Sequence, residues 1–149
     1  MKKLRVLLAG AEVICNLRNA FESWGFDVVA VTDGKQACGV LRSGQYEICI
    51  LDWELPRVSG AEVCRWIRSV DVPTHPHIVL VTQGNRKEQI QAAYMAGADD
   101  YIASPFDPEN IHSVVSAFAQ RVEQATGFFY DVRDFDPLEH YRRDLAASV

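Results

Sequence analysis

The sequence predicts a doubly wound α/β fold, in which five parallel strands lie between two layers of helices. Short apolar segments alternate five times with segments of helical character along the chain. The apolar segments are mostly continuous runs of Val, Ile and Leu, which is typical of parallel strands covered on both faces. A (βα)₅ alternation over 149 residues therefore predicts an open three-layer sandwich with right-handed crossovers.

The individual elements follow from this alternation. The expected strands cover residues 4–9, 26–32, 48–52, 78–82 and 100–103. Apolar residues recur at helical spacing in three of the segments between and after them. These stripes are Val13, Leu17, Ala20, Phe21 and Trp24; Val63, Ile67 and Val70; and Ile111, Val114, Val115, Phe118 and Val122. The last helix has the clearest start, because Asp107 is a good cap and Pro108 suits the first helical position.

The chain changes character near its end. The signals are a break at Thr126 and Gly127, a Phe-Phe-Tyr cluster at 128–130 and a capping box at 136–139. We expect one domain over residues 1–125, followed at 126–149 by a linker and the start of a helix that leads to a further domain. A C-terminal helix folded back on the domain is the alternative. The aromatic cluster favours a homodimer or a tethered module.

Composition and charge exclude several classes of protein. The formal net charge of −5 argues against direct binding of nucleic acid, because phosphate binding needs clustered Lys and Arg. No apolar run approaches the ~20 residues that span a bilayer, so we expect no membrane span. The four cysteines fall inside predicted helices and strands without Cys-x-x-Cys spacing; they are Cys15, Cys38, Cys49 and Cys64. We expect buried free thiols and a cytoplasmic protein.

Polar side chains mark the predicted carboxyl edge of the sheet, where ligands and chemistry collect in doubly wound folds. Asp52 ends the third strand, Thr82 ends the fourth, and Ser104 follows the fifth. The sequence contains no Gly-rich phosphate loop, Ser/His/Asp set or nucleotide fingerprint. We therefore expect a regulatory domain rather than an enzyme.

These segments resemble the CheY-like receiver domain of response regulators, over roughly residues 3–125. The motifs are Leu-Asp-Trp-Glu-Leu-Pro at 51–56 with Gly60, Val81-Thr82, and Gly-Ala-Asp-Asp-Tyr-Ile-Ala-Ser-Pro-Phe at 97–106. The resemblance implies a flavodoxin/CheY-like fold and a place in two-component phosphorelay signalling. It makes Asp52 the phosphoacceptor, Thr82 the hydroxyl that turns toward the phosphoryl group, and Tyr101 the aromatic switch that follows Thr82.

The resemblance also implies partners. A sensor histidine kinase or phosphotransfer protein would supply the phosphoryl group. The fourth helix, fifth strand and last helix would pass the signal to an output domain or partner protein, through a surface around Ile90, Ala93, Tyr94 and Tyr101. The resemblance further implies a cis peptide bond before Pro105.

The sequence departs from this family at the metal site. The family has an acidic pair after the first strand, where this chain has Gly10 and Ala11. It also has a Lys before the Pro, where this chain has Ser104. Mg²⁺ is usually held through one or two carboxylates, and here these would be Asp52 with Glu54 or Glu12. A lost charge near a phosphoryl group removes on the order of a few kcal/mol of stabilisation.

Several hypotheses therefore stay open. In the first, Asp52 is phosphorylated with an unusual Mg²⁺ site. In the second, the chain is a pseudo-receiver that acts as a phosphorylation-independent interaction or dimerisation module. A flavodoxin-like cofactor-binding protein is a distant third, because the loop after the first strand has no Ser or Thr. At the level of residues, Asp52 and Thr82 are alternatively structural groups at strand ends, and Glu12 and Glu54 solvated surface acids.

Overall fold

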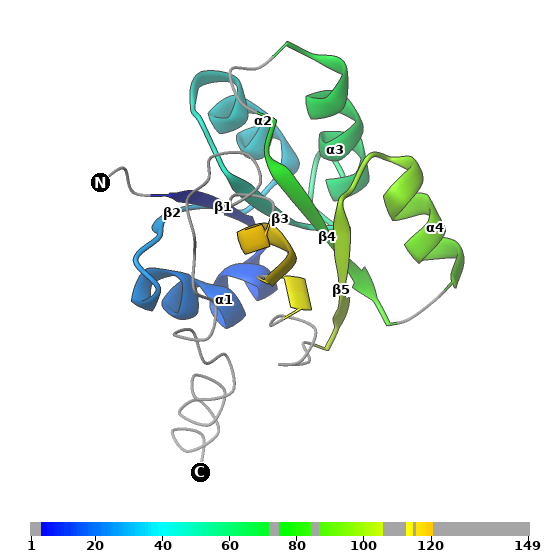
Figure 1. Cartoon of the computed structure of the whole chain (residues 1–149). Coiled ribbons are helices and arrows are strands. Elements are labelled where there is room, and N and C mark those ends of the chain that lie inside the picture. Colours follow the sequence, from blue (N-terminus) through cyan, green and yellow to red (C-terminus); the bar gives the residue numbers. More distant parts are fainter. Residues whose placement is uncertain (1–3, 72–74, 85–86, 106–112, 115, 121–149) are drawn as a thin grey trace.

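The computed structural model describes residues 4–71, 75–84, 87–105, 113–114 and 116–120. Strands and helices alternate through this part of the chain. The elements are β1 (Arg5–Ala9), α1 (Ala11–Ser23), β2 (Asp27–Val31), α2 (Gly34–Ser43), β3 (Ile48–Asp52), α3 (Gly60–Ser69), β4 (His77–Gln83), α4 (Lys87–Met95) and β5 (Asp100–Ser104). The strands form one parallel sheet in the order β2-β1-β3-β4-β5 (Figure 1). The doubly wound fold is thus confirmed.

The predicted strands agree with the observed ones to within one residue at either end. The last predicted helix is only partly described: residues 113–114 and 116–120 are helical, and Val114 and Phe118 are buried. The other predicted features of the C-terminal part lie outside the described residues. These are Asp107 and Pro108, the stripe residues Ile111, Val115 and Val122, and the whole segment 126–149.

The sheet is covered on both faces, which explains why its strands are continuously apolar. One face packs against α1 and against Val114 and Phe118, through strand residues such as Leu8 and Ile50. The other face packs against α2, α3 and α4, through alternate strand residues such as Leu7. Figure 1 shows α1 on one side of the sheet and α2, α3 and α4 on the other. Each central strand therefore has no solvent side to which polar residues could be assigned.

Local signals begin the helices that follow the strands. The side chain of Asp33 caps α2 by accepting a hydrogen bond from the Gln36 amide at 2.7 Å. Ser59 caps α3 in the same way, accepting from the Glu62 amide at 3.2 Å. These polar caps satisfy amide groups that a helix leaves without an intrahelical acceptor. No side chain caps α1, which instead follows Gly10.

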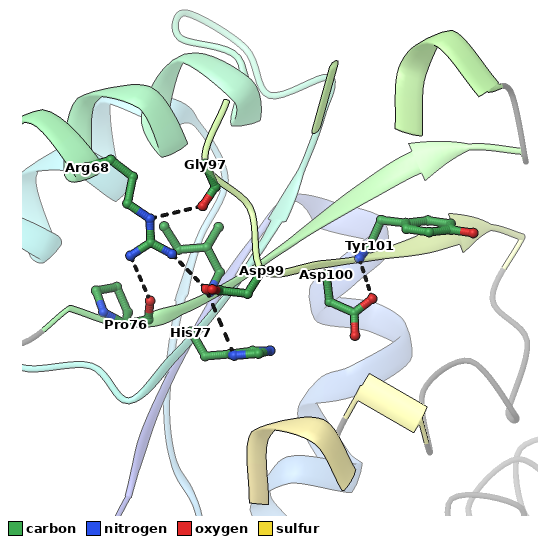
Figure 2. A network of polar contacts seen from close by, with 8 residues as sticks. Arg68, Pro76, His77, Gly97, Asp99, Asp100 and Tyr101 are labelled. Atoms are coloured by element: carbon green, nitrogen blue, oxygen red, sulfur yellow. Dashed lines mark hydrogen bonds and ion pairs between the residues drawn. The ribbon is translucent and has the colours of Figure 1, made fainter. Parts of the chain in front are cut away.

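A polar network joins α3 to the loops that lead into β4 and β5 (Figure 2). The guanidinium of Arg68 donates to the Gly97 carbonyl at 3.0 Å and to the Pro76 carbonyl at 3.2 Å. It also donates to Asp99 Oδ2 at 2.7 Å, and the same oxygen accepts from the Ile78 amide at 2.8 Å. This network fixes the start of β5 against β4 and the end of α3.

Other sequence expectations have mixed outcomes. The peptide bond between Ser104 and Pro105 is cis, as the resemblance implied. Two of the four free thiols, Cys49 and Cys64, are buried, and burial raises their pKa values, that of Cys64 to about 11. Cys15 is exposed, so its predicted burial is wrong: it lies on the solvent side of α1.

Among the described residues, no helix has the length and apolar character needed to span a membrane.

Candidate functional site

The carboxyl edge of the sheet brings the predicted site residues together. Asp52 ends β3 and Thr82 lies near the end of β4, in strands that pair directly. Ser104 ends β5, and Glu12 lies in the first turn of α1. Glu54 follows Asp52 in the turn before α3 and is exposed. Parallel strands place their carboxyl ends at one edge, which is why residues so distant in sequence share this site.

Two glycines allow neighbouring backbone segments to approach Asp52 closely. A Cβ atom on Gly10 would lie 2.7 Å from the Cβ of Asp52, and Gly10 has a φ of 115°. A Cβ on Gly60 would lie 2.2 Å from the backbone oxygen of Asp52. Only glycine fits such close approaches, and only glycine readily adopts that φ. The loop after β1 therefore lies directly against Asp52.

The Asp52 carboxylate is half-buried and has acidic neighbours. Its Oδ1 accepts a hydrogen bond from the Glu54 amide at 3.0 Å, so it does cap the following turn. Burial raises the pKa of Asp52; that hydrogen bond lowers it in part, while the charges of Glu12 and Glu54 raise it further. Among the described residues, no Lys, Arg or His forms an ion pair with Asp52. The site thus has an excess of negative charge.

Ser104 stands where the resemblance places a Lys, and its hydroxyl is already engaged. Ser104 Oγ donates a hydrogen bond to Oε1 of Glu12 at 3.0 Å. This bond links the end of β5 to the first turn of α1. A hydroxyl in this position carries no charge, so it leaves the negative potential around Asp52 uncompensated.

Thr82 is fully buried, and its hydroxyl faces the chain's own backbone. Thr82 Oγ1 donates to the Gly84 carbonyl at 3.1 Å. Tyr101 is partly buried and packs edge-on against Tyr94, with ring centroids 6.2 Å apart. Thr82 is thus bonded to Gly84 in this arrangement, and the switch role of Thr82 and Tyr101 stays a prediction.

The surface beside Tyr101 differs in detail from the sequence expectation. Tyr94 is 47% exposed and Met95 is 88% exposed. Ala93 is completely buried, so its assignment to the surface is wrong: it lies on the side of α4 that packs into the core. Met95 was missed, although its place in the last turn of α4, beside Tyr94, was visible in the sequence.

The carboxylates do not fit a magnesium site well. Within the part of the chain that the structure describes, no group of three or more His, Cys, Asp or Glu residues is placed to hold a metal ion. Glu12 accepts from Ser104, and Gly10 occupies the space beside Asp52. Mg²⁺ needs near-octahedral oxygen coordination, which a pair of acidic side chains close to the acceptor normally helps to supply.

Two contacts of this site are not predicted by the sequence. One is the hydrogen bond between Glu12 and Ser104, which lie 92 residues apart. The other is the bond from Thr82 to Gly84, for which a glycine two residues after a strand-end threonine was the available signal. Non-local contacts of the first kind have no periodicity that would reveal them.

Comparison with known proteins identifies the family. A family profile described as the response regulator receiver domain matches residues 11–116. The chain belongs to this family. This receiver domain is 34% identical over 108 residues to the phosphate regulon transcriptional regulatory protein PhoB of Rhizobium meliloti, covering 72% of the chain and 47% of PhoB. It is 28% identical over 124 residues to the alkaline phosphatase synthesis transcriptional regulatory protein PhoP of Bacillus subtilis, covering 83% and 51%.

Solved structures agree on the fold of this receiver domain. One neighbour is the receiver domain of a Pseudomonas aeruginosa sensor histidine kinase, with a TM-score of 0.67 and 23% identity, covering 79% of this chain and 98% of that one. That structure has a magnesium ion coordinated in its active-site cleft. The receiver domain described here spans about half the length of PhoB and PhoP. The family match makes it a response regulator receiver domain, which is a regulatory domain of two-component systems.

Proposed function

We propose that this receiver domain acts as a phosphorylation-independent interaction module, a pseudo-receiver, within a two-component pathway. The observation that carries the proposal is the surroundings of Asp52. Its carboxylate has two acidic neighbours and, among the described residues, no cationic partner. Transfer of a phosphoryl group to a carboxylate needs positive charge to stabilise the developing charge on the phosphoryl oxygens.

The partner surface in this proposal is formed by α4 and β5. Tyr94, Met95 and Tyr101 place apolar and aromatic groups on it. Aromatic residues and Met are enriched in protein interfaces, so the grouping of these three side chains favours a surface that binds a partner. The partner in this hypothesis is a histidine kinase, a phosphotransfer protein, a second copy of the chain or an attached output domain.

We also propose that residues 126–149 are a linker that leads from the receiver domain, residues 1–125, to an output domain. Support comes from the relatives PhoB and PhoP, which are transcriptional regulators that match this chain over only about half of their own length. The sequence also repeats apolar residues at helical spacing, at Leu138, Tyr141, Leu145 and Val149, which favours the start of a helix that leads to that domain. Direct contact with DNA would then belong to the output domain.

The second candidate is a working phosphoacceptor at Asp52. It is favoured by the position of Asp52, which ends β3 beside Thr82 and is half-exposed. In this case Glu12 or Glu54 would have to leave its present place to hold Mg²⁺. Thr82 would also have to release the Gly84 carbonyl.

Two measurements separate these functions. Intact-mass spectrometry after incubation with acetyl phosphate and Mg²⁺ should show no added phosphoryl group, in either the wild type or Asp52→Ala. Titration with Mn²⁺ should leave the NMR signals of the Asp52 and Gly10 amides without selective broadening. A phosphoryl group on the wild type alone would establish Asp52 as an acceptor and overturn the proposal. Broadening confined to these amides would show a metal site beside Asp52 and would count against the proposal.

A further inference from the structure

A path of hydrogen bonds runs along the carboxyl edge from α1 to β4. Glu12 Oε1 accepts from Ser104 Oγ at 3.0 Å, and the Ser104 carbonyl accepts from the Gly84 amide at 3.0 Å. The Gly84 carbonyl then accepts from Thr82 Oγ1 at 3.1 Å. The path thus joins three separate segments of the chain, and none of its donors carries a charge.

The path ends at the buried hydroxyl of Thr82, whose orientation it fixes. Thr82 is fully buried, and a buried hydroxyl is costly unless it has a hydrogen-bond partner. The Gly84 carbonyl provides that partner, and Gly84 has a φ of 66°, which favours glycine. The orientation of the Thr82 hydroxyl therefore depends on where Gly84 is held, and Gly84 is held by Ser104.

The start of the path links α1 to β5, which also share one hydrophobic core cluster through residues such as Val13 and Ile102. Within the described residues, the bond from Ser104 to Glu12 is the only side-chain hydrogen bond between α1 and β5. β5 is an edge strand, since it pairs with β4 alone. Ser104 ends β5 three residues after Tyr101.

We propose that Glu12 and Ser104 are positioning residues, whose hydrogen bond holds the end of β5 against α1 and thereby keeps Gly84 and the Thr82 hydroxyl in one arrangement. No metal ion or phosphoryl group takes part. This inference rests on the proposed function and deepens it: the pair fixes the carboxyl edge of the sheet in a domain whose Asp52 is not modified.

Amide hydrogen exchange at Gly84, followed by NMR in the unmodified protein, tests this role. Loss of one hydrogen bond of ordinary strength should speed local opening roughly five-fold. We expect this acceleration in Ser104→Ala and in Glu12→Ala. The double variant should be no faster than either single one, because both remove the same bond. Ser104→Thr keeps the hydroxyl and should stay within about two-fold of the wild type.

Ser69→Ala is the matched control. Ser69 is an exposed serine whose hydroxyl donates to the Trp66 carbonyl at the far end of α3, so its loss should leave Gly84 unchanged. Unchanged exchange in Ser104→Ala, or effects of the two alanine variants that simply add, would overturn the proposal. Should Ser104→Ala fail to fold, Glu12→Ala and Ser104→Thr give the same comparison. Because acetyl phosphate is absent, failure here is distinct from failure of the proposed function.

Discussion

Two aspartates at opposite ends of the sheet have contrasting surroundings. Asp99, directly before β5 at the amino edge of the sheet, accepts from the Arg68 guanidinium and the Ile78 amide through one oxygen (Figure 2). Asp52, at the carboxyl end of β3, accepts one backbone amide and lies near two other acids. A partly buried carboxylate stabilises a fold when it is paired and costs stability when it is not. The first aspartate is therefore structural, whereas the second has the poorly compensated charge typical of functional sites.

The largest expected effect comes from breaking the paired end. Asp99→Ala would leave the Arg68 guanidinium and the Ile78 amide without their shared acceptor, in a region where both charged side chains are 25% exposed. We expect a loss of about 3 kcal/mol in the free energy of unfolding, measured with urea. Arg18→Ala, which removes an exposed pair with Glu22 in α1, should cost only about 0.5 kcal/mol. Equal losses in the two variants would contradict the contrast.

The next largest loss of stability is expected from the close contact between Gly10 and Asp52, at the carboxyl edge of the sheet. Gly10→Ala must place a Cβ against Asp52 and keep a φ of 115°, so we expect a loss of about 2 kcal/mol in urea unfolding. Gly39→Ala is the control, because its new Cβ meets no atom within 4 Å and it lies within α2. That variant should gain about 0.5–1 kcal/mol. A neutral Gly10→Ala would mean that the loop after β1 moves away easily.

Asp52→Asn should stabilise the protein in a pH-dependent way. The folded state raises the pKa of Asp52, chiefly through burial, so the unfolded chain gives up this proton at lower pH than the folded one. The penalty is therefore absent below the unfolded pKa of about 4 and is complete once the pH exceeds the folded value. We expect a rise in Tm on the order of a few degrees at pH 7, fading toward pH 3. A rise that persisted undiminished at pH 3, or that also appeared in the exposed-site control Asp71→Asn, would argue against this origin.

The smallest expected change in stability is that of Ser104→Lys. An ammonium near Glu12 would lower the pKa of Asp52, because it compensates part of the negative potential at the site. The free energy of unfolding should change by less than about 1 kcal/mol, since the new pair is exposed. NMR titration of the Asp52 carboxyl carbon measures the shift, with Ser104→Thr as the uncharged control. If the pKa of Asp52 did not fall, a positive charge at position 104 would lie too far from Asp52 to compensate its negative potential.

The fold was predictable because its signals are local. Each strand is a continuous apolar segment, and the cap at Ser59 lies beside the helix that it begins. Burial on both faces of the sheet imposes this composition on every strand, so the positions and ends of the strands along the chain could be predicted from the apolar runs alone. The place of Asp52 at the carboxyl edge follows from the same pattern.

The contacts within the site were decided only by the tertiary structure. The sequence places Gly10 and Ser104 where a receiver domain has acidic and basic groups, but it does not say what fills the space. The fold brings Gly10 against Asp52 and joins Ser104 to Glu12 across 92 residues. It also bonds Thr82 to Gly84. Such contacts depend on the distances between elements that are set by packing, and packing is a property of the whole core rather than of any one segment.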